Sequence, residues 1–120
     1  MRKDDVIAHV FQTKAETIFD ENGKIKDCVW DAKKRGVYMD DCHGRVHWSY
    51  PNLQNAFSQS FYPDIISSDL VRVSEYTRPG FSLLYAMSVN SAAGMPTEQN
   101  FTERNLYPCQ NLLALKRKQV

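Results

Sequence analysis

Three side chains of types that bind divalent metal ions recur along the sequence at about the length of one βα unit. His9, His43 and Asp69 are separated by 34 and 26 residues. Two imidazoles and one carboxylate are a ligand set typical of zinc and similar divalent ions. The spacing alone leaves a second interpretation open, in which His9 is a core residue and Asp69 forms a turn or caps a helix.

Each of the three lies in or directly after a short apolar segment that has the composition of a buried strand,. Parallel strands bring their carboxyl ends together at one edge of a sheet. If the three segments are parallel neighbours, the three side chains therefore converge there. This convergence is the hypothesis from which a metal site follows.

The elements that must position these residues alternate between apolar segments and helical patterns. Asp27 is expected to cap the first helix and Gly36 to end it, because glycine tolerates the left-handed conformation that ends helices. Alternation with short connections is typical of a parallel α/β sheet with right-handed crossovers. Strands are expected at 6–11, 37–40 and 64–70, and helices at 27–35, 49–62, 82–93 and 107–120.

Composition limits the class of protein. A chain of 120 residues is expected to form one domain, and its formal net charge of +1 favours neither a nucleic-acid partner nor a membrane surface,. It contains no apolar run of about 18 residues and does not begin with a signal-like segment, so a soluble cytoplasmic protein is expected. The odd number of cysteines, three, fits reduced thiols better than a disulfide framework,.

Four stretches of this sequence, together with the junction at 93–96, carry a family resemblance over residues 6 to 98. They are His9-Val10-Phe11, Asp27 to Gly36, Asp40-Asp41-Cys42-His43-Gly44, and Phe61-Tyr62-Pro63-Asp64-Ile65-Ile66-Ser67-Ser68-Asp69-Leu70. The chain resembles the C-terminal half of metal-dependent hydrolases of the amidohydrolase superfamily, in particular the dihydroorotase-like deacetylases. Residues 99–120 depart from this pattern and are expected to form a divergent, partly helical tail.

The resemblance implies half of a (β/α) barrel with a one- or two-metal centre, most simply of zinc. It implies that His9, His43 and Asp69 bind metal, and that Asp69 is also the catalytic proton shuttle for attack of an activated water on a carbonyl group. The expected substrates are small molecules with an amide or ester bond, as in deacetylation or cyclic amide hydrolysis. Gly44, Arg45 and Trp48 are the candidates for substrate binding.

The sequence departs from the family pattern at several positions. It has no His-x-His pair and no matching lysine strand, and Cys42 stands where the family loop has glycine. We therefore expect the isolated chain to be inactive and to need the missing N-terminal half-barrel or a second copy as partner. The alternative is a noncatalytic remnant that self-associates through exposed sheet edges, since unpaired edges are adhesive.

Three weaker possibilities arise from the same loop and from the tail. His43 and His47 are four residues apart and have the spacing of two ligands on one helix face, although Gly44 disfavours a helix there. Cys42 beside His43 has the composition of an activated nucleophile, but a structural thiol is the commoner case. The basic run at 116–118 is expected to be a solvated tail rather than a phosphate site.

Overall fold

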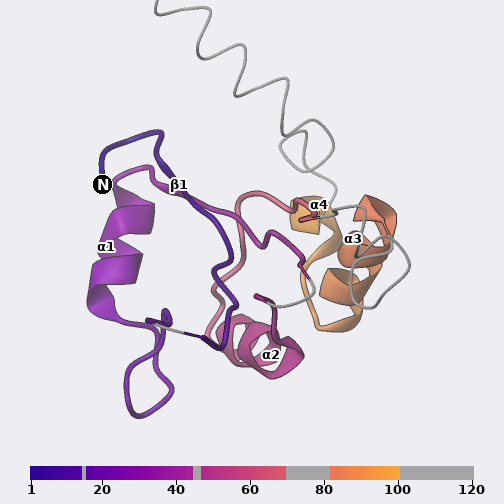
Figure 1. Ribbon diagram of the computed structural model, residues 1–120, viewed down its shortest axis with the longest axis horizontal. Helices are drawn as coiled ribbons and strands as arrows, with labels where there is room; N and C mark the ends of the chain where they lie inside the picture. Colours follow the sequence, from indigo (N-terminus) through magenta and orange to yellow (C-terminus); the bar gives the residue numbers. More distant parts are fainter. Residues whose placement is uncertain (15, 45–46, 70–81, 101–120) are drawn as a thin grey trace, which may run out of the picture.

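The computed structural model describes residues 1–14, 16–44, 47–69 and 82–100 (Figure 1). Short strands and helices alternate over its first half, as the sequence predicts, and helices follow. Helix α1 lies on one side of the short sheet and α3 with α4 on the other. The elements are β1 (Val6–Ile7), α1 (Asp27–Lys34), β2 (Tyr38–Met39), α2 (Tyr50–Ser58), α3 (Leu83–Ala92) and α4 (Thr97–Asn100).

Strands β1 and β2 pair in parallel, with Val6 opposite Tyr38 and Ile7 opposite Met39, and α1 crosses between them. The predicted strand over 6–11 is wrong in length: it ends at Ile7, and His9 has a left-handed backbone with φ 57°. A left-handed residue cannot continue a strand, so the chain turns there. The strand predicted at 37–40 is likewise reduced to two residues.

A third parallel segment continues the sheet without forming a strand. Asp40 bridges Ile65 and His43 bridges Ser68, both in parallel orientation. The backbone N–H of Asp41 donates to the Ile65 carbonyl at 3.0 Å, and that of His43 donates to the Ser67 carbonyl at 2.8 Å. The strand predicted at 64–70 is therefore present only as isolated bridges up to 68, and position 70 lies outside the described residues.

The helices begin and end largely for the expected reasons. Asp27 lies in the first turn of α1 rather than at its cap, which is Lys26; there its carboxylate still complements the positive end of the helix dipole,. Gly36 follows the helix with φ 89°, a conformation that glycine adopts at little cost,. Ser49 caps α2, and its hydroxyl accepts from the Asn52 N–H at 3.4 Å,. Ser82 caps α3 in the same way.

The core lies between the sheet and the apolar faces of the helices. The ring of Phe11 meets Phe57 of α2 edge-on, with centroids 6.0 Å apart, and Trp30 of α1 meets Phe61 in the same manner at 5.1 Å. Edge-on pairs of this kind add to the free energy gained by burying the rings. The fully buried apolar side chains are Phe11, Met39, Leu53, Ala56, Phe61 and Ile66.

Helix α4 was not expected from the sequence. Its last residue, Asn100, is buried, and the side-chain amide of Asn100 donates to the Met87 carbonyl at 2.7 Å, which attaches α4 to α3. The helix predicted over 107–120 lies outside the described residues. Within the described residues, no helix has the length and apolar character needed to cross a bilayer.

Candidate metal centre

The three predicted ligands follow three neighbouring parallel segments. His9 comes two residues after β1, His43 lies beyond β2, and Asp69 comes directly after Ser68, the partner of His43 in a bridge. The backbone N–H of Asp69 also donates to the His43 carbonyl at 3.3 Å. All three therefore lie beyond the carboxyl ends of their segments. In residues 1–14, 16–44, 47–69 and 82–100, no three side chains of His, Cys, Asp or Glu are already arranged to hold an ion.

One ring nitrogen of His9 is hydrogen-bonded to the backbone, and the other is available to bind a metal ion. Its Nδ1 lies 3.0 Å from the carbonyl oxygen of Cys42, which can only accept, so Nδ1 carries the proton,. In the neutral tautomer that this bond favours, Nε2 carries the lone pair, and it lies 3.7 Å from Cys42 Sγ. A backbone carbonyl that fixes the tautomer through Nδ1 is the usual support of a metal-binding histidine.

His43 is buried, at 1% exposure, yet neither of its ring nitrogens has a hydrogen-bond partner among the described residues. Its ring stacks on Trp48, with centroids 3.9 Å apart and an angle of 25° between the planes. Nδ1 is 3.5 Å from Oδ2 of Asp41, too far for a good hydrogen bond,. Buried polar atoms without partners are rare, and such an imidazole fits a ligand position.

Asp41, which the sequence did not single out, lies beside the candidate ligand His43. Its carboxylate is fully buried and accepts from the Trp48 indole N–H at 2.8 Å and from the Asn90 side-chain amide at 2.9 Å. These bonds hold the carboxylate beside the His43 ring, with Oδ2 3.5 Å from Nδ1. Asn90 lies 49 residues away on α3, so no local pattern could have indicated it.

The substrate-binding candidates have different environments. Trp48 stacks on His43 and its indole N–H donates to Asp41, so it packs against the first residue and orients the second. A Cβ added to Gly44 would approach the Asp69 Cβ to 3.1 Å and its Oδ2 to 3.2 Å, so glycine lets the Asp69 side chain lie against this loop. Arg45 lies outside the described residues.

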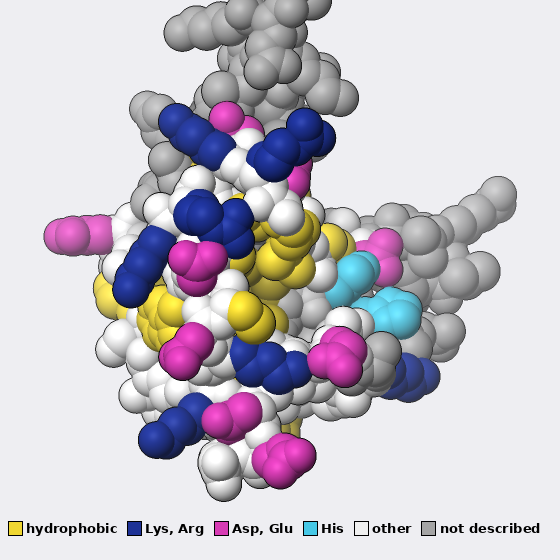
Figure 2. All heavy atoms as spheres, turned by 90° about the vertical axis from the view of Figure 1, so that its left-hand side faces the viewer, with side chains coloured by type: hydrophobic (Ala, Val, Ile, Leu, Met, Phe, Trp, Pro, Cys, Tyr) yellow, Lys and Arg dark blue, Asp and Glu magenta, His cyan; other side chains and the backbone are white. Residues whose placement is uncertain are grey.

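His47 does not pair with His43 on a helix, because neither residue is helical. Instead its ring lies 5.1 Å from that of His9, and His47 is exposed. Figure 2 shows histidine side chains side by side on one face of the molecule, with acidic side chains next to them. The hypothesis of a His43–His47 helical pair is therefore wrong.

Asp40 and Cys42 lie next to the predicted ligands, and burial affects both. Burial raises the pKa of the Asp40 carboxyl, although hydrogen bonds from the Ser67 hydroxyl, at 2.7 and 2.9 Å, and from the Cys42 N–H oppose this. Burial likewise raises the pKa of the Cys42 thiol, and the nearby carboxylates raise it further. In the absence of an ion Cys42 is therefore a thiol, which argues against the activated nucleophile considered from the sequence.

The pKa of Asp40 makes the stability of the chain depend on pH. A carboxyl whose pKa is raised by folding stabilises the fold fully below its ordinary value of 3.8, and this contribution is lost as the pH rises through the folded-state pKa,. Asp40→Asn keeps an acceptor for Ser67 and Cys42 but has no carboxyl group. We expect the free energy of unfolding of this variant, minus that of the wild type, to increase as the pH rises from 3.8 towards neutrality. Urea denaturation at a series of pH values measures this difference. A difference that is constant or shrinks with pH would contradict it.

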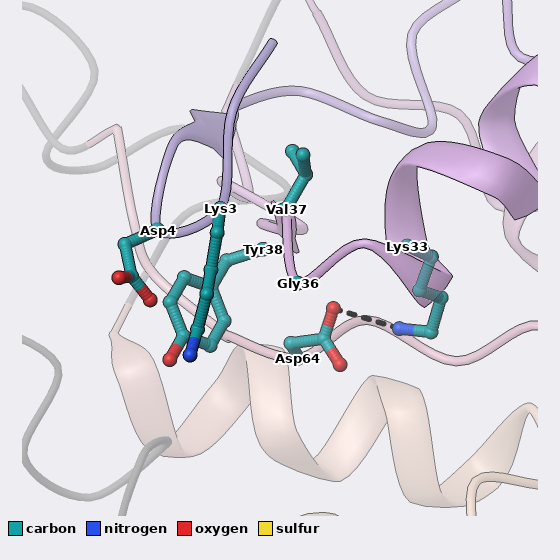
Figure 3. A pocket seen from close by; sticks show the side chains of 7 residues that line it. All are labelled: Lys3, Asp4, Lys33, Gly36, Val37, Tyr38 and Asp64. Carbon is teal, nitrogen blue, oxygen red and sulfur yellow. Dashed lines mark ion pairs between the residues drawn. The ribbon is translucent and has the colours of Figure 1, made fainter.

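A separate hollow of about 240 Å³ lies at the other end of the sheet. It is lined by Tyr38, the first residue of β2, and by Lys33 at the end of α1 (Figure 3). Lys33 Nζ forms an ion pair with Asp64 Oδ2 at 2.7 Å and also donates to the Tyr62 carbonyl at 2.9 Å. Lys33 is thus already engaged, and none of the three predicted ligands lines this hollow.

Comparison with known proteins finds a related sequence and similar solved structures. The chain is 27% identical over 112 residues to a deacetylase of Enterococcus faecalis. The aligned region covers 92% of this chain and 30% of the relative. It superimposes on an adenine deaminase with a TM-score of 0.84 and 26% identity, covering 96% of this chain and 32% of the other. A dihydroorotase gives a TM-score of 0.71 and 24% identity, covering 93% and 29%. No family model matches.

The chain spans about 30% of the length of these relatives. The three proteins, a deacetylase, an adenine deaminase and a dihydroorotase, match nearly the whole of this chain at similar sequence identity. They confirm the resemblance of this chain to the amidohydrolase superfamily.

Proposed function

We propose that this chain is one sector of the (β/α) barrel of a metal-dependent hydrolase that cleaves amide or ester bonds in small molecules, of the deacetylase or cyclic-amidase type. The observation that carries the proposal is the position of His9, His43 and Asp69 after three neighbouring parallel segments. The similarity to a deacetylase and a dihydroorotase supports this reaction class.

The residues fit the ion individually. His43 offers buried ring nitrogens without hydrogen bonds, and His9 offers Nε2 with its tautomer already fixed. A bound divalent ion, most simply zinc, would polarise a substrate carbonyl and lower the pKa of a water molecule. Asp69 is exposed at the same edge, so its carboxylate is free to accept a proton from that water and pass it to the leaving group,.

The proposed activity depends on the rest of the barrel. The chain contains three histidines and no His-x-His pair, so the remaining ligands must come from a segment that it does not contain. We propose the missing half-barrel as this partner. A second copy would contribute only the same ligand types and would leave the ligand set incomplete.

A chimera tests the proposal. Residues 1–100 replace the matching segment of the E. faecalis relative, and the product is assayed with zinc against N-acetylated compounds and cyclic amides. We expect hydrolysis of one of these classes, and we expect His43→Ala to lose both the bound zinc, measured by elemental analysis, and the activity. Lys34→Ala, on the exposed side of α1, is the matched control and should retain both. A folded chimera that binds zinc equally well with and without His43 would refute the assignment.

A further inference from the structure

The loop after β2 brings a thiol and an imidazole together in a way that the proposed ligand set does not use. Cys42 Sγ lies 3.7 Å from His9 Nε2, while the carbonyl oxygen of the same cysteine accepts from His9 Nδ1 at 3.0 Å. One residue thus fixes the imidazole tautomer through its backbone and presents its sulfur to the free nitrogen. A cation placed between the sulfur and Nε2 would contact both atoms.

The distance agrees with chelation of one ion. Zinc binds sulfur at about 2.3 Å and imidazole nitrogen at about 2.0–2.1 Å, so two such ligands on a tetrahedral ion are about 3.5 Å apart. The observed 3.7 Å separation needs almost no adjustment. Binding replaces the thiol proton, which passes to solvent, and leaves a thiolate and a neutral imidazole on the ion.

A second imidazole lies beside the pair. The rings of His9 and His47 have centroids 5.1 Å apart and are tilted by 50°. Two imidazoles on one tetrahedral zinc ion have centroids about 5 Å apart, given the same metal–nitrogen distance. His47 is exposed, so a rotation about its side-chain bonds meets little steric resistance,.

The charge of the surroundings favours a cation at this place. The side chains of Asp40, Asp41 and Asp69 lie around Cys42. A divalent ion bound between Cys42 and His9 would add two positive charges among these three acidic side chains, which favours its binding there.

We propose that His9 and Cys42 form a chelating pair for a soft or borderline divalent ion, with the imidazole of His47 as third ligand. This inference rests on the proposed function, because His9 belongs both to the ligand set His9, His43 and Asp69 and to the chelating set His9, Cys42 and His47. A sulfur ligand would make the centre prefer zinc, cobalt or cadmium over magnesium or manganese, which bind oxygen ligands.

Cobalt(II) provides a readout that does not depend on activity. The full chain carries Cys28→Ser and Cys109→Ser, so that Cys42 is the single thiol, and is titrated with cobalt(II). We expect a thiolate-to-cobalt charge-transfer band in the near ultraviolet. Cys42→Ser and His9→Ala should abolish the band, and His47→Ala should weaken the apparent affinity by about tenfold or more.

A chemical readout on the same single-thiol chain is the rate at which iodoacetamide alkylates Cys42. We expect zinc to slow the reaction by about tenfold or more, because the metal-bound sulfur is shielded, and magnesium to leave it unchanged. A matched chain that retains only the exposed Cys28 is the control and should react at the same rate with and without zinc.

The outcomes separate this inference from the proposed function. Cobalt binding without a sulfur band, weakened by His43→Ala or Asp69→Asn, would overturn the role of Cys42 and support the proposed ligand set. A sulfur band that persists in both of those variants would support the chelating pair and contradict that set. No cobalt binding by a folded chain, or zinc without effect on alkylation, would overturn the inference and leave only an S–H···N hydrogen bond.

Discussion

Replacing Asn90 by leucine should lower the free energy of unfolding by about 3 kcal/mol, although the side chain keeps nearly the same size. The Asn90 amide donates to Asp41 at 2.9 Å, and Asp41 is fully buried with the Trp48 indole as its other hydrogen-bond donor. A buried carboxylate that loses a partner retains its desolvation cost without compensation, which is why such losses are large. Chemical denaturation of the two chains measures the effect.

Asn52 offers a matched control for this substitution. Its side-chain amide donates to the uncharged Gln12 carbonyl at 2.7 Å, so Asn52→Leu removes one neutral hydrogen bond and should cost about 1 kcal/mol,. In an Asp41→Asn background, where the carboxyl acceptor is replaced by an amide, Asn90→Leu should also cost only about 1 kcal/mol. Equal effects of the two leucine substitutions in the wild-type background would contradict the role of Asn90 as a hydrogen-bond donor to the buried Asp41 side chain.

Replacing Asp69 by asparagine in the completed barrel should lower kcat by about 10²- to 10⁴-fold, the range expected when a general acid–base group is removed. Asparagine has the same shape and preserves the close contact with Gly44, but its amide cannot accept a proton at neutral pH,. Steady-state kinetics of the chimera with saturating zinc measures the change. KM should change much less than kcat, since the proton transfer belongs to the reaction and not to substrate binding.

Asp31→Asn is the control for this experiment. Asp31 lies on the exposed side of α1 in an ion pair with Arg35 at 2.7 Å, and its loss should leave kcat unchanged. Asp69→Glu retains a carboxyl group one methylene further out and should restore part of the rate. An Asp69→Asn enzyme with wild-type kcat would show that another group shuttles the proton.

The order of the first four elements and the family resemblance could be predicted from the sequence. Helix patterns and caps are local: Ser49, the proline at the start of α2, and the glycines after α1 and α3 act on their immediate neighbours, so their effects could be read directly,. The parallel pairing of β1 and β2 also follows from local order, because a helix between two strands returns the chain in the same direction,.

The strand lengths could not be predicted, because contacts between residues far apart in the sequence decided them. The apolar run at 6–11 has the composition of a longer strand, but His9 adopts φ 57° and its ring bonds to Cys42, 33 residues away. Similarly, Ile65 and Ser68 pair with Asp40 and His43, just after β2, through separate bridges. The Asp64 carboxylate accepts from the Met39 N–H in place of a regular strand ladder. Side-chain bonds between distant segments thus replaced regular pairing.

By itself the sequence determined that His9, His43 and Asp69 follow successive segments of one α/β unit, since residue order and helix-forming patterns are properties of the linear chain. That these three hold an ion stays a prediction. Only the tertiary structure decided which atoms meet: His9 Nε2 and Cys42 Sγ across 3.7 Å, and Asn90 of α3 on the buried Asp41. The reason is that burial and hydrogen-bond geometry arise from contacts between segments tens of residues apart, which local propensity does not encode.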